Sequence, residues 1–186
     1  MLDVYHHRGV TAWLTGLSGA GKSTIASAAS RELLALGFHV EILDADELRK
    51  HLNRDLGFSR TDRIENCRRI GYVANLLTRQ GIVVLVAAIA PYRLIRQELR
   101  ETIGEFLEIY VDAPLHVCES RDPKGLYRKT RRGELSGFTG VDDPYEEPLS
   151  PDLRCTTERE TILESVEKVV NLIVSVAQDG RPISLK

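Results

Sequence analysis

Residues 16–23, Gly-Leu-Ser-Gly-Ala-Gly-Lys-Ser, match the phosphate-loop pattern G-x-x-x-x-G-K-[ST] at every fixed position. In this pattern the glycines let backbone N–H groups close around phosphate oxygens, and the start of the next helix adds a positive field. Lys22 is placed to reach the outer phosphates, and the Ser23 hydroxyl to hold Mg²⁺. The stretch predicts a nucleoside triphosphate site formed by Gly16, Ser18, Gly19, Ala20, Gly21, Lys22, Ser23 and Thr24.

The residues on both sides of this loop support the match. A short apolar run at residues 10–15 precedes it and is typical of a buried strand. After the loop, apolar residues recur at helical spacing, at Ile25, Ala29, Leu33 and Leu36. The loop therefore lies between a predicted strand and a predicted helix, which makes a chance glycine-rich turn the weaker interpretation.

Length and composition predict one domain over residues 1–186. With 42% hydrophobic residues the chain can bury a substantial core without disulfides. The three cysteines and five histidines are scattered, which favours a reducing compartment and argues against structural zinc. A net charge of −2 argues against nucleic-acid binding. No apolar run is long enough to span a membrane, so we expect a cytoplasmic protein without a membrane partner.

Positive charge gathers in two places on this nearly neutral chain. One cluster lies within residues 60–69 and the other within residues 121–132. The charge pattern leaves two interpretations open, a site for small anionic ligands or two solvated surface faces.

Strands and helices alternate along the rest of the chain. Apolar runs predict strands at residues 39–43, 82–87, 106–111 and 153–156. Helical spacing, proline positions and a capping box from Ser59 to Asp62 predict helices at residues 46–52, 59–80, 91–103 and 162–173, and one starting at Pro114. The alternation predicts an α/β phosphate-loop fold, with a mainly parallel five-stranded sheet and helices on both faces.

Two features follow from this layout. Ligands bind beyond the carboxyl ends of parallel strands, where we expect Gly16, Asp44, Ala90 and Asp112 to converge. Residues 121–151 break the alternation and are rich in glycine, proline and charge. A long irregular segment in a compact domain is usually functional or disordered.

Two classes of phosphate-loop protein compete for this sequence. A switch-type GTPase needs a guanine-reading Asn-Lys-x-Asp, which the sequence lacks, and an Asp-x-x-Gly at the end of a strand. The stretch Asp122-Pro123-Lys124-Gly125 fits the second pattern but follows a predicted helix. A small-molecule kinase needs a carboxylate near the acceptor hydroxyl and a lid that excludes water. We therefore favour the kinase.

Asp44 and Asp46 are the candidate carboxylates, because the second predicted strand ends beside the phosphate loop. One of the pair could accept the proton of the acceptor hydroxyl while the other holds metal-bound water. The simpler alternative is that Asp46 caps the next helix.

Six further blocks follow the loop in order: LDADELR at 43–49, DLGFS at 55–59, DRIENCRR at 62–69, APYR at 90–93, RDPKGLY at 121–127 and GFTG at 137–140. With the loop, they resemble the adenylyl-sulfate kinase family over roughly residues 8–174. The resemblance implies phosphorylation by ATP, with Mg²⁺, of the ribose 3′-hydroxyl of adenosine 5′-phosphosulfate. It also implies a lid over residues 121–151 and a homodimer.

The resemblance assigns roles to individual residues. Asp46 is implied as the base, supported by Asp44 and Lys22. Arg121 and Thr157 are implied at the ATP adenine. Phe58 and Phe138 are implied to sandwich the acceptor adenine, and Arg49 and Arg63 to bind its phosphate and sulfate. The full implied acceptor set is Asp46, Arg49, Phe58, Arg63, Asn66, Ile89, Ala90, Lys124, Gly137 and Phe138.

The sequence departs from the family pattern at two positions. Ala45 replaces a common glycine between the two aspartates, and its methyl group would be strained at a positive φ. Ala90 replaces a serine described in some members as a phosphorylated intermediate. Because alanine has no hydroxyl, we expect direct in-line transfer. Two alternatives stay open: a kinase of another small acceptor such as a nucleoside monophosphate, and a catalytically silent nucleotide-binding regulator.

Overall fold

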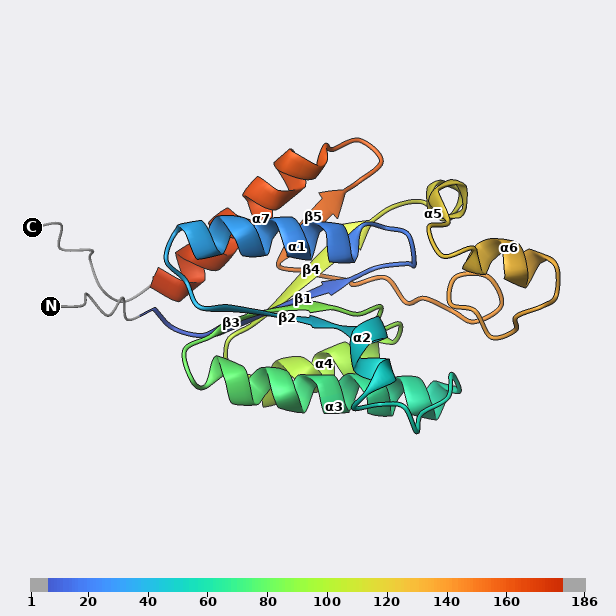
Figure 1. The fold of residues 1–186 in the computed structure, drawn as a ribbon, viewed down its shortest axis with the longest axis horizontal. Helices are drawn as coiled ribbons and strands as arrows, with labels where there is room; N and C mark the ends of the chain where they lie inside the picture. Colours follow the sequence, from blue (N-terminus) through green and yellow to red (C-terminus); the bar gives the residue numbers. More distant parts are fainter. Residues whose placement is uncertain (1–6, 179–186) are drawn as a thin grey trace, which may run out of the picture.

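The structure, a computed structural model, describes residues 7–178 and is built around one five-stranded sheet (Figure 1). All four strand pairs are parallel, in the order β2-β3-β1-β4-β5. The strands are β1 (Val10–Thr15), β2 (Val40–Asp44), β3 (Val83–Ala87), β4 (Phe106–Asp112) and β5 (Leu153–Thr156). The α/β fold with a parallel five-stranded sheet is therefore as the sequence predicts.

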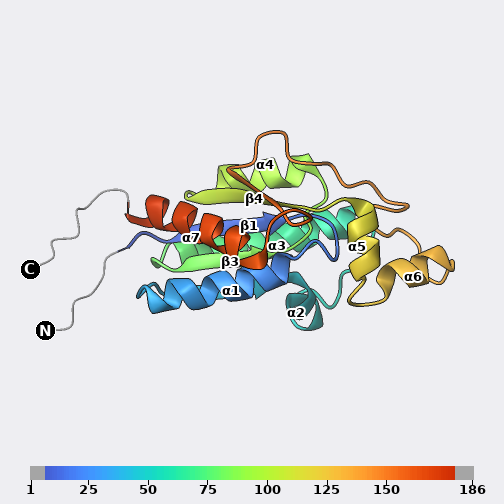
Figure 2. The same cartoon turned by 90° about the horizontal axis from the view of Figure 1, so that it is seen from above.

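Helices cover both faces of this sheet (Figures 1 and 2). One face carries α1 (Lys22–Ala35) and α7 (Ile162–Gln178), and the other carries α3 (Arg60–Thr78) and α4 (Arg93–Thr102). Three short helices lie toward the carboxyl ends of the strands: α2 (Ala45–Lys50), α5 (Leu115–Arg121) and α6 (Leu126–Arg131). None of the helices within residues 7–178 is long and apolar enough to cross a membrane.

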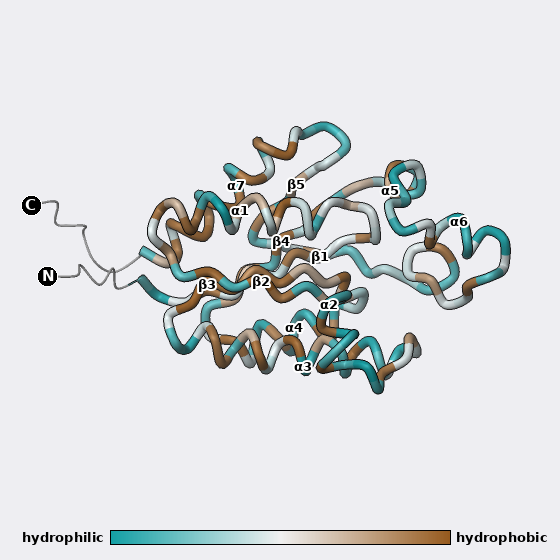
Figure 3. The backbone as a smooth tube through the Cα atoms, viewed as in Figure 1, coloured by the Kyte–Doolittle hydropathy of each residue, from teal (hydrophilic) through white to brown (hydrophobic). Residues whose placement is uncertain are grey.

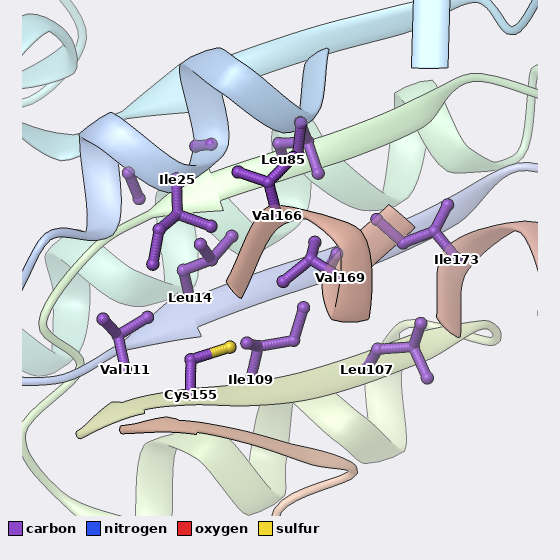
Figure 4. Close-up of a cluster of buried hydrophobic side chains, with 14 of the residues drawn as sticks. Leu14, Ile25, Leu85, Leu107, Ile109, Val111, Cys155, Val166, Val169 and Ile173 are labelled. Atoms are coloured by element: carbon purple, nitrogen blue, oxygen red, sulfur yellow. The ribbon is translucent and has the colours of Figure 1, made fainter. Parts of the chain in front are cut away.

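The core consists of two apolar layers, one on each side of the sheet. Every residue of β1 and β3 is buried, as expected for strands covered on both faces, and the hydropathy of the backbone shows the same apolar centre (Figure 3). Leu14, Leu85 and Ile109 pack on one side against Ile25 of α1 and Val169 of α7 (Figure 4). This packing fixes the sheet, and with it the positions of the loops at the strand ends.

The predicted boundaries agree closely with the structure, and three expectations are corrected. Ser59 caps α3 by accepting from the Asp62 N–H at 3.1 Å, as the capping box predicts. The helix predicted from Pro91 begins only at Arg93. The segment at residues 121–151 was expected to be irregular throughout, but it contains α6. The strain expected at Ala45 is not found, because Ala45 lies in the first turn of α2 at a negative φ.

Gly16 shows why the phosphate loop must begin with glycine. Its φ is 142°, and a Cβ atom built there would lie 2.3 Å from the Val111 carbonyl oxygen. The end of β4 therefore packs directly against the backbone of the loop, which leaves no room for a side chain.

Candidate active site

A cavity of about 910 Å³ opens beyond the carboxyl ends of the strands. It brings together both sets of residues expected from the sequence. The residues of the phosphate-loop set that line it are Ser18, Gly19, Ala20, Gly21, Lys22, Ser23, Thr24, Arg121 and Thr157. Those of the acceptor set are Asp46, Arg49, Phe58, Arg63, Asn66, Ile89, Ala90, Lys124, Gly137 and Phe138.

Three residues expected at the site lie outside the cavity lining. Gly16 lies within the fold of the loop, where its carbonyl accepts from Lys22 Nζ at 2.9 Å. Asp44 is reached through Ser23 rather than from the cavity. Asp112 lines a second cavity, of about 500 Å³, beside Tyr110. Asp112 therefore ends its strand at the same edge of the sheet but does not line the main cavity.

Lys22 begins α1 and folds back over the loop. Its Nζ donates to the Gly16 and Leu17 carbonyl oxygens at 2.9 and 2.7 Å. Burial lowers the pKa of Lys22 from 10.5 to about 8, because removal from water disfavours the charged ammonium. A phosphate ion would supply the opposite charge that this partly buried site lacks. The Lys22 ammonium is therefore stabilised more by an anionic ligand than the ammonium of an exposed lysine would be.

Asp44 connects the phosphate loop to the start of α2, which carries Asp46. Its Oδ2 accepts from the Ser23 hydroxyl at 2.6 Å, and its Oδ1 accepts from the Asp46 N–H at 2.9 Å. Asp44 is therefore the N-cap of α2, a correction to the alternative that gave this role to Asp46. The capping frees the Asp46 side chain, which lies in the first turn of the helix and lines the cavity.

The Asp46 carboxylate forms an ion pair with Lys124, which lies between α5 and α6. Both side chains are about half exposed, so the pair lies at the mouth of the cavity rather than in its floor. Exposed ion pairs of this kind are worth ~0–1 kcal/mol and exchange partners at little cost. The contact therefore joins residues 121–151 to α2 without locking them together.

Phe58 and Phe138 both line the cavity but differ in burial. Phe58 is 62% exposed, with the Arg49 guanidinium 4.4 Å from its ring centroid. Phe138 is 8% exposed and packs edge-on against Tyr127, with ring centroids 4.9 Å apart. Phe138 is therefore part of the packed structure, whereas the ring of Phe58 is largely exposed at the cavity.

Arg63 joins the two loops that carry these rings. Its Nε donates to the Phe58 carbonyl at 2.9 Å, and its terminal nitrogens donate to Thr139 Oγ1 at 2.8 Å and to the Gly137 carbonyl at 2.5 Å. The Arg63 guanidinium therefore holds the backbone next to Phe58 and Phe138. These contacts use only some of its N–H donors. Arg49 similarly donates to the Leu56 and Gly57 carbonyls.

Asn66 and Cys67 lie deeper in the cavity wall, on α3. Asn66 is 6% exposed, and its Oδ1 accepts from Asn53 Nδ2 at 3.1 Å. Within residues 7–178 the amide NH₂ of Asn66 makes no hydrogen bond. Burial raises the pKa of the Cys67 thiol to about 12, and it also raises the thiol pKa values of Cys118 and Cys155. All three thiols of the chain are buried, unpaired and protonated at neutral pH.

Arg121 and Thr157 meet at the far end of the phosphate loop. Arg121 donates to Thr157 Oγ1 at 3.1 Å and to the Thr157 carbonyl at 2.7 Å, and Thr157 Oγ1 donates to the Ala20 carbonyl at 2.9 Å. The start of α7, including Glu160 and Ile162, also lines this end. Both residues were expected here from the family resemblance, and the return of the chain past β5 brings Thr157 to the loop.

Ala90 and Ile89 line the cavity beside the end of β1, where the phosphate loop begins. Ala90 has a φ of 43° and is the only non-glycine residue in the left-handed region within residues 7–178. Thr15 Oγ1 donates to the Ile89 carbonyl at 2.5 Å, and Arg96 donates to the Ala90 carbonyl at 2.6 Å. Sequence reasoning missed Thr15 and Arg96, because both lie within regular elements and their partners are distant in sequence.

The parallel sheet, the phosphate loop and the second set of cavity residues define a phosphate-loop kinase, a phosphotransferase that acts on an alcohol group. The family model for adenylylsulphate kinase matches residues 8–156. The chain belongs to the adenylyl-sulfate kinase family.

Known relatives cover nearly the whole chain. The adenylyl-sulfate kinase of Microcystis aeruginosa is 58% identical over 169 residues, which are 91% of this chain and 93% of the relative. That of Rippkaea orientalis is 54% identical over 178 residues, 96% of this chain and 98% of the relative. The APS kinase of Mycobacterium tuberculosis, solved in complex with AMPPNP and APS, has a TM-score of 0.87 and 48% identity, covering 89% of this chain and 98% of its own.

Proposed function

We propose that this protein transfers the γ-phosphoryl group of ATP to the ribose 3′-hydroxyl of adenosine 5′-phosphosulfate, giving 3′-phosphoadenosine 5′-phosphosulfate and ADP. The observation that carries the proposal is the single cavity that joins the phosphate loop to Phe58 and Phe138. Its volume of about 910 Å³ lies in the upper part of the range for small-molecule sites, as two nucleotides require. The Mycobacterium tuberculosis relative, solved with both a nucleotide analogue and APS, supports the same arrangement here.

The donor half of the site holds ATP along the phosphate loop. Backbone N–H groups of the loop and the start of α1 supply donors and a positive field for the phosphates. Lys22 exchanges the Gly16 and Leu17 carbonyls for phosphate oxygens. The planar Arg121 guanidinium, held by Thr157, offers a surface on which the donor adenine stacks.

The residues at the start of α1 suit Mg²⁺. The Ser23 hydroxyl and the Asp44 carboxylate are hard oxygen donors 2.6 Å apart, and Mg²⁺ usually takes one or two such protein ligands together with substrate phosphates. Bound there, Mg²⁺ would neutralise charge on the β- and γ-phosphates. Asp44 itself would orient Ser23 and keep α2 capped.

The acceptor half reads an adenine and a phosphosulfate. The exposed face of Phe58 and the fixed ring of Phe138 bind the base, and each stacked base is worth about 1–3 kcal/mol. Arg49, Arg63 and Lys124 supply positive charge for the phosphosulfate. When Lys124 moves to this anion, it leaves Asp46, whose carboxylate is then free to accept the proton of the 3′-hydroxyl.

Transfer is direct, because Ala90 offers no hydroxyl that could carry a phosphoryl group. The test combines the purified protein with Mg²⁺, adenosine 5′-phosphosulfate and ATP labelled in its γ-phosphate. We expect label in a 3′-phosphorylated nucleotide and none on the protein in a single turnover. Absence of the 3′-phosphorylated product would overturn the proposed reaction, and a labelled protein on the path to product would overturn direct transfer.

Two further properties belong to the proposal. The chain works as one domain and forms a homodimer, which sedimentation at micromolar concentration tests. Higher assemblies occur among relatives: a hexameric APS kinase of Thiobacillus denitrificans shares 36% identity with a TM-score of 0.67, and the match covers 29% of that chain.

The three buried, unpaired thiols suit the reducing cytoplasm, where we place the enzyme.

A further inference from the structure

Arg96 of α4 is a buried arginine that lies outside the cavity lining and has no role in the reaction described above. It is 2% exposed, and its guanidinium reaches three separate elements. Nε donates to Glu108 Oε1 of β4 at 2.6 Å, while the terminal nitrogens donate to the Ala90 carbonyl at 2.6 Å and the Glu146 carbonyl at 2.5 Å. Glu108 is the only charged partner within reach among residues 7–178. A buried charge persists only when it is paired and hydrogen-bonded, so this fork fixes the relative positions of all three partners.

One of these partners is in a strained conformation. Ala90 belongs to residues 88–91, which we call the acceptor loop because Ile89 and Ala90 line the acceptor half of the cavity. The φ of 43° at Ala90 is disfavoured for a residue with a Cβ atom. Such a conformation persists only where surrounding contacts impose it. The two successive carbonyls of Ile89 and Ala90 are held here by Thr15 and Arg96.

The second partner belongs to residues 143–147, which we call the return segment because this part of the lid leads back toward the sheet. Several contacts besides the one from Arg96 join this segment to the acceptor loop and its neighbours, among them bonds from Tyr92 to Asp143 and from Arg93 to Glu147. The Tyr145 and Thr15 hydroxyls share a hydrogen bond of 2.9 Å, the Glu146 N–H donates to the Pro91 carbonyl at 2.8 Å, and Glu146 Oε2 accepts from the Arg93 N–H at 2.7 Å. Arg96 thus binds the acceptor loop and the return segment to β4 through a charged fork, while Thr15 binds the same two segments to β1 through one hydroxyl.

We propose that Arg96, held by Glu108, is a positioning residue for the acceptor. It keeps Ile89 and Ala90 in the conformation that shapes the acceptor half of the cavity and fastens that loop to the return segment of the lid. The identity of the acceptor rests on the proposed function; the brace itself does not. The phosphate loop is fixed by other contacts, through Lys22 and Thr157, so loosening the brace affects the acceptor and spares ATP.

The decisive comparison uses two arginines of the same helix. Arg96→Lys keeps the charge beside Glu108 but removes the planar fork that reaches both carbonyls. The matched control is Arg100→Lys, because Arg100 lies one turn further along α4 and also approaches Glu108, at 3.7 Å. Arg100 bonds to Asp152 at 2.6 Å and, within residues 7–178, makes no hydrogen bond or ion pair with the acceptor loop.

For Arg96→Lys we expect the KM for adenosine 5′-phosphosulfate to rise about tenfold or more, while the KM for ATP and kcat stay within about threefold. For Arg100→Lys we expect all three constants to stay within about threefold. A residue with only a structural role would lower stability without separating the two KM values. Equal changes of the acceptor KM in both variants would overturn the proposal.

A second measurement is independent of activity. Amide hydrogen exchange of the substrate-free proteins reports opening of each segment. We expect faster exchange at residues 88–91 and 143–147 in Arg96→Lys, with residues 16–24 unchanged, and no such increase in Arg100→Lys. Unchanged exchange at residues 88–91 would overturn the brace even if the wild-type protein turns over the acceptor. If the wild type makes no 3′-phosphorylated product, the proposed function fails, but the hydrogen-exchange measurement still tests whether Arg96 holds these segments.

Glu108→Gln is a second test of the brace, which can be used if Arg96→Lys does not fold. Glutamine keeps the shape and one acceptor oxygen but removes the charge that holds the guanidinium. We expect the same pattern at smaller size, a rise of about threefold in the acceptor KM with faster exchange in both segments. An acceptor KM and exchange pattern like those of the wild type would overturn the role given to the ion pair.

Discussion

The Ser23 hydroxyl donates a hydrogen bond to Asp44 Oδ2 at 2.6 Å, which joins the first turn of α1 to the end of β2. Two residues that are 21 positions apart in the sequence thus present their oxygens at one point. Because Asp44 also caps α2, the same carboxylate aligns the phosphate loop with the helix that carries Asp46. The Asp44 side chain therefore links the phosphate loop to α2.

For Asp44→Asn we expect the Mg²⁺ concentration that gives half-maximal turnover to rise about 10–100-fold, the usual cost of losing an oriented partner of a metal ligand. Asparagine caps helices as well as aspartate, so α2 should remain folded. Turnover measured against Mg²⁺ concentration checks this, with Ser23→Thr as the control that keeps a hydroxyl. An unchanged Mg²⁺ requirement would remove Asp44 from the metal site.

For Asp46→Asn we expect turnover to fall by about 10²–10⁴-fold, because the amide cannot accept the proton of the acceptor hydroxyl. Affinity for ATP should stay the same, since Asp46 pairs with Lys124 rather than with the phosphate loop. Glu47→Gln is the matched control: the neighbouring carboxylate is exposed and pairs with Lys50 at 2.7 Å. Turnover that survives in Asp46→Asn would exclude Asp46 as the base.

Phe58 and Phe138 should respond differently to truncation. For Phe58→Ala we expect acceptor binding to weaken by about 1–3 kcal/mol, with Tm nearly unchanged, because a ring that is 62% exposed contributes little to the core. For Phe138→Ala we expect a similar loss of affinity and, in addition, about 3–5 kcal/mol less stability, because this ring is buried against Tyr127. Thermal unfolding and acceptor titration separate the two. Equal losses of stability would contradict the difference in burial.

Lys22 predicts a pH dependence of ATP affinity. Its pKa in the free protein is lowered to about 8, and ATP favours the protonated form, so binding above that pH requires uptake of a proton. Affinity should be constant below about pH 8 and should weaken by up to about tenfold per pH unit above it. Calorimetric titration at several pH values measures this. Lys22→Arg stays charged throughout and should show a flat profile; a flat profile in the wild type would contradict the lowered pKa.

Local patterns carried most of the fold and of the donor half of the site. The phosphate loop is contiguous, the strands are apolar along their length, and the Ser59 cap involves residues three positions apart, so each is visible in a short window of sequence. The acceptor residues Phe58 and Phe138 were identified through family blocks, and the structure brings both to one cavity.

Contacts between distant segments could not be predicted in the same way. Arg96 looks like any helix-surface arginine, because its partners Glu108 and Glu146 follow 12 and 50 positions later. Asp112 ends a strand as Asp44 does, but it lines the second cavity together with residues between Gly140 and Glu147, which are distant in sequence. Helix α6 was missed because six residues between glycines give too little periodicity.

The burial of all three thiols has a practical consequence for watching the lid move. Protonated, enclosed thiols react slowly with maleimides, so a cysteine introduced on the surface would be the preferred attachment point for a fluorophore. Arg132 at the end of α6 is well exposed and pairs only loosely with Glu134 within the described chain, at 3.9 Å. Arg132→Cys would therefore carry a label at the outer tip of the lid on an otherwise native background, with each opening and closing recorded as a change in emission.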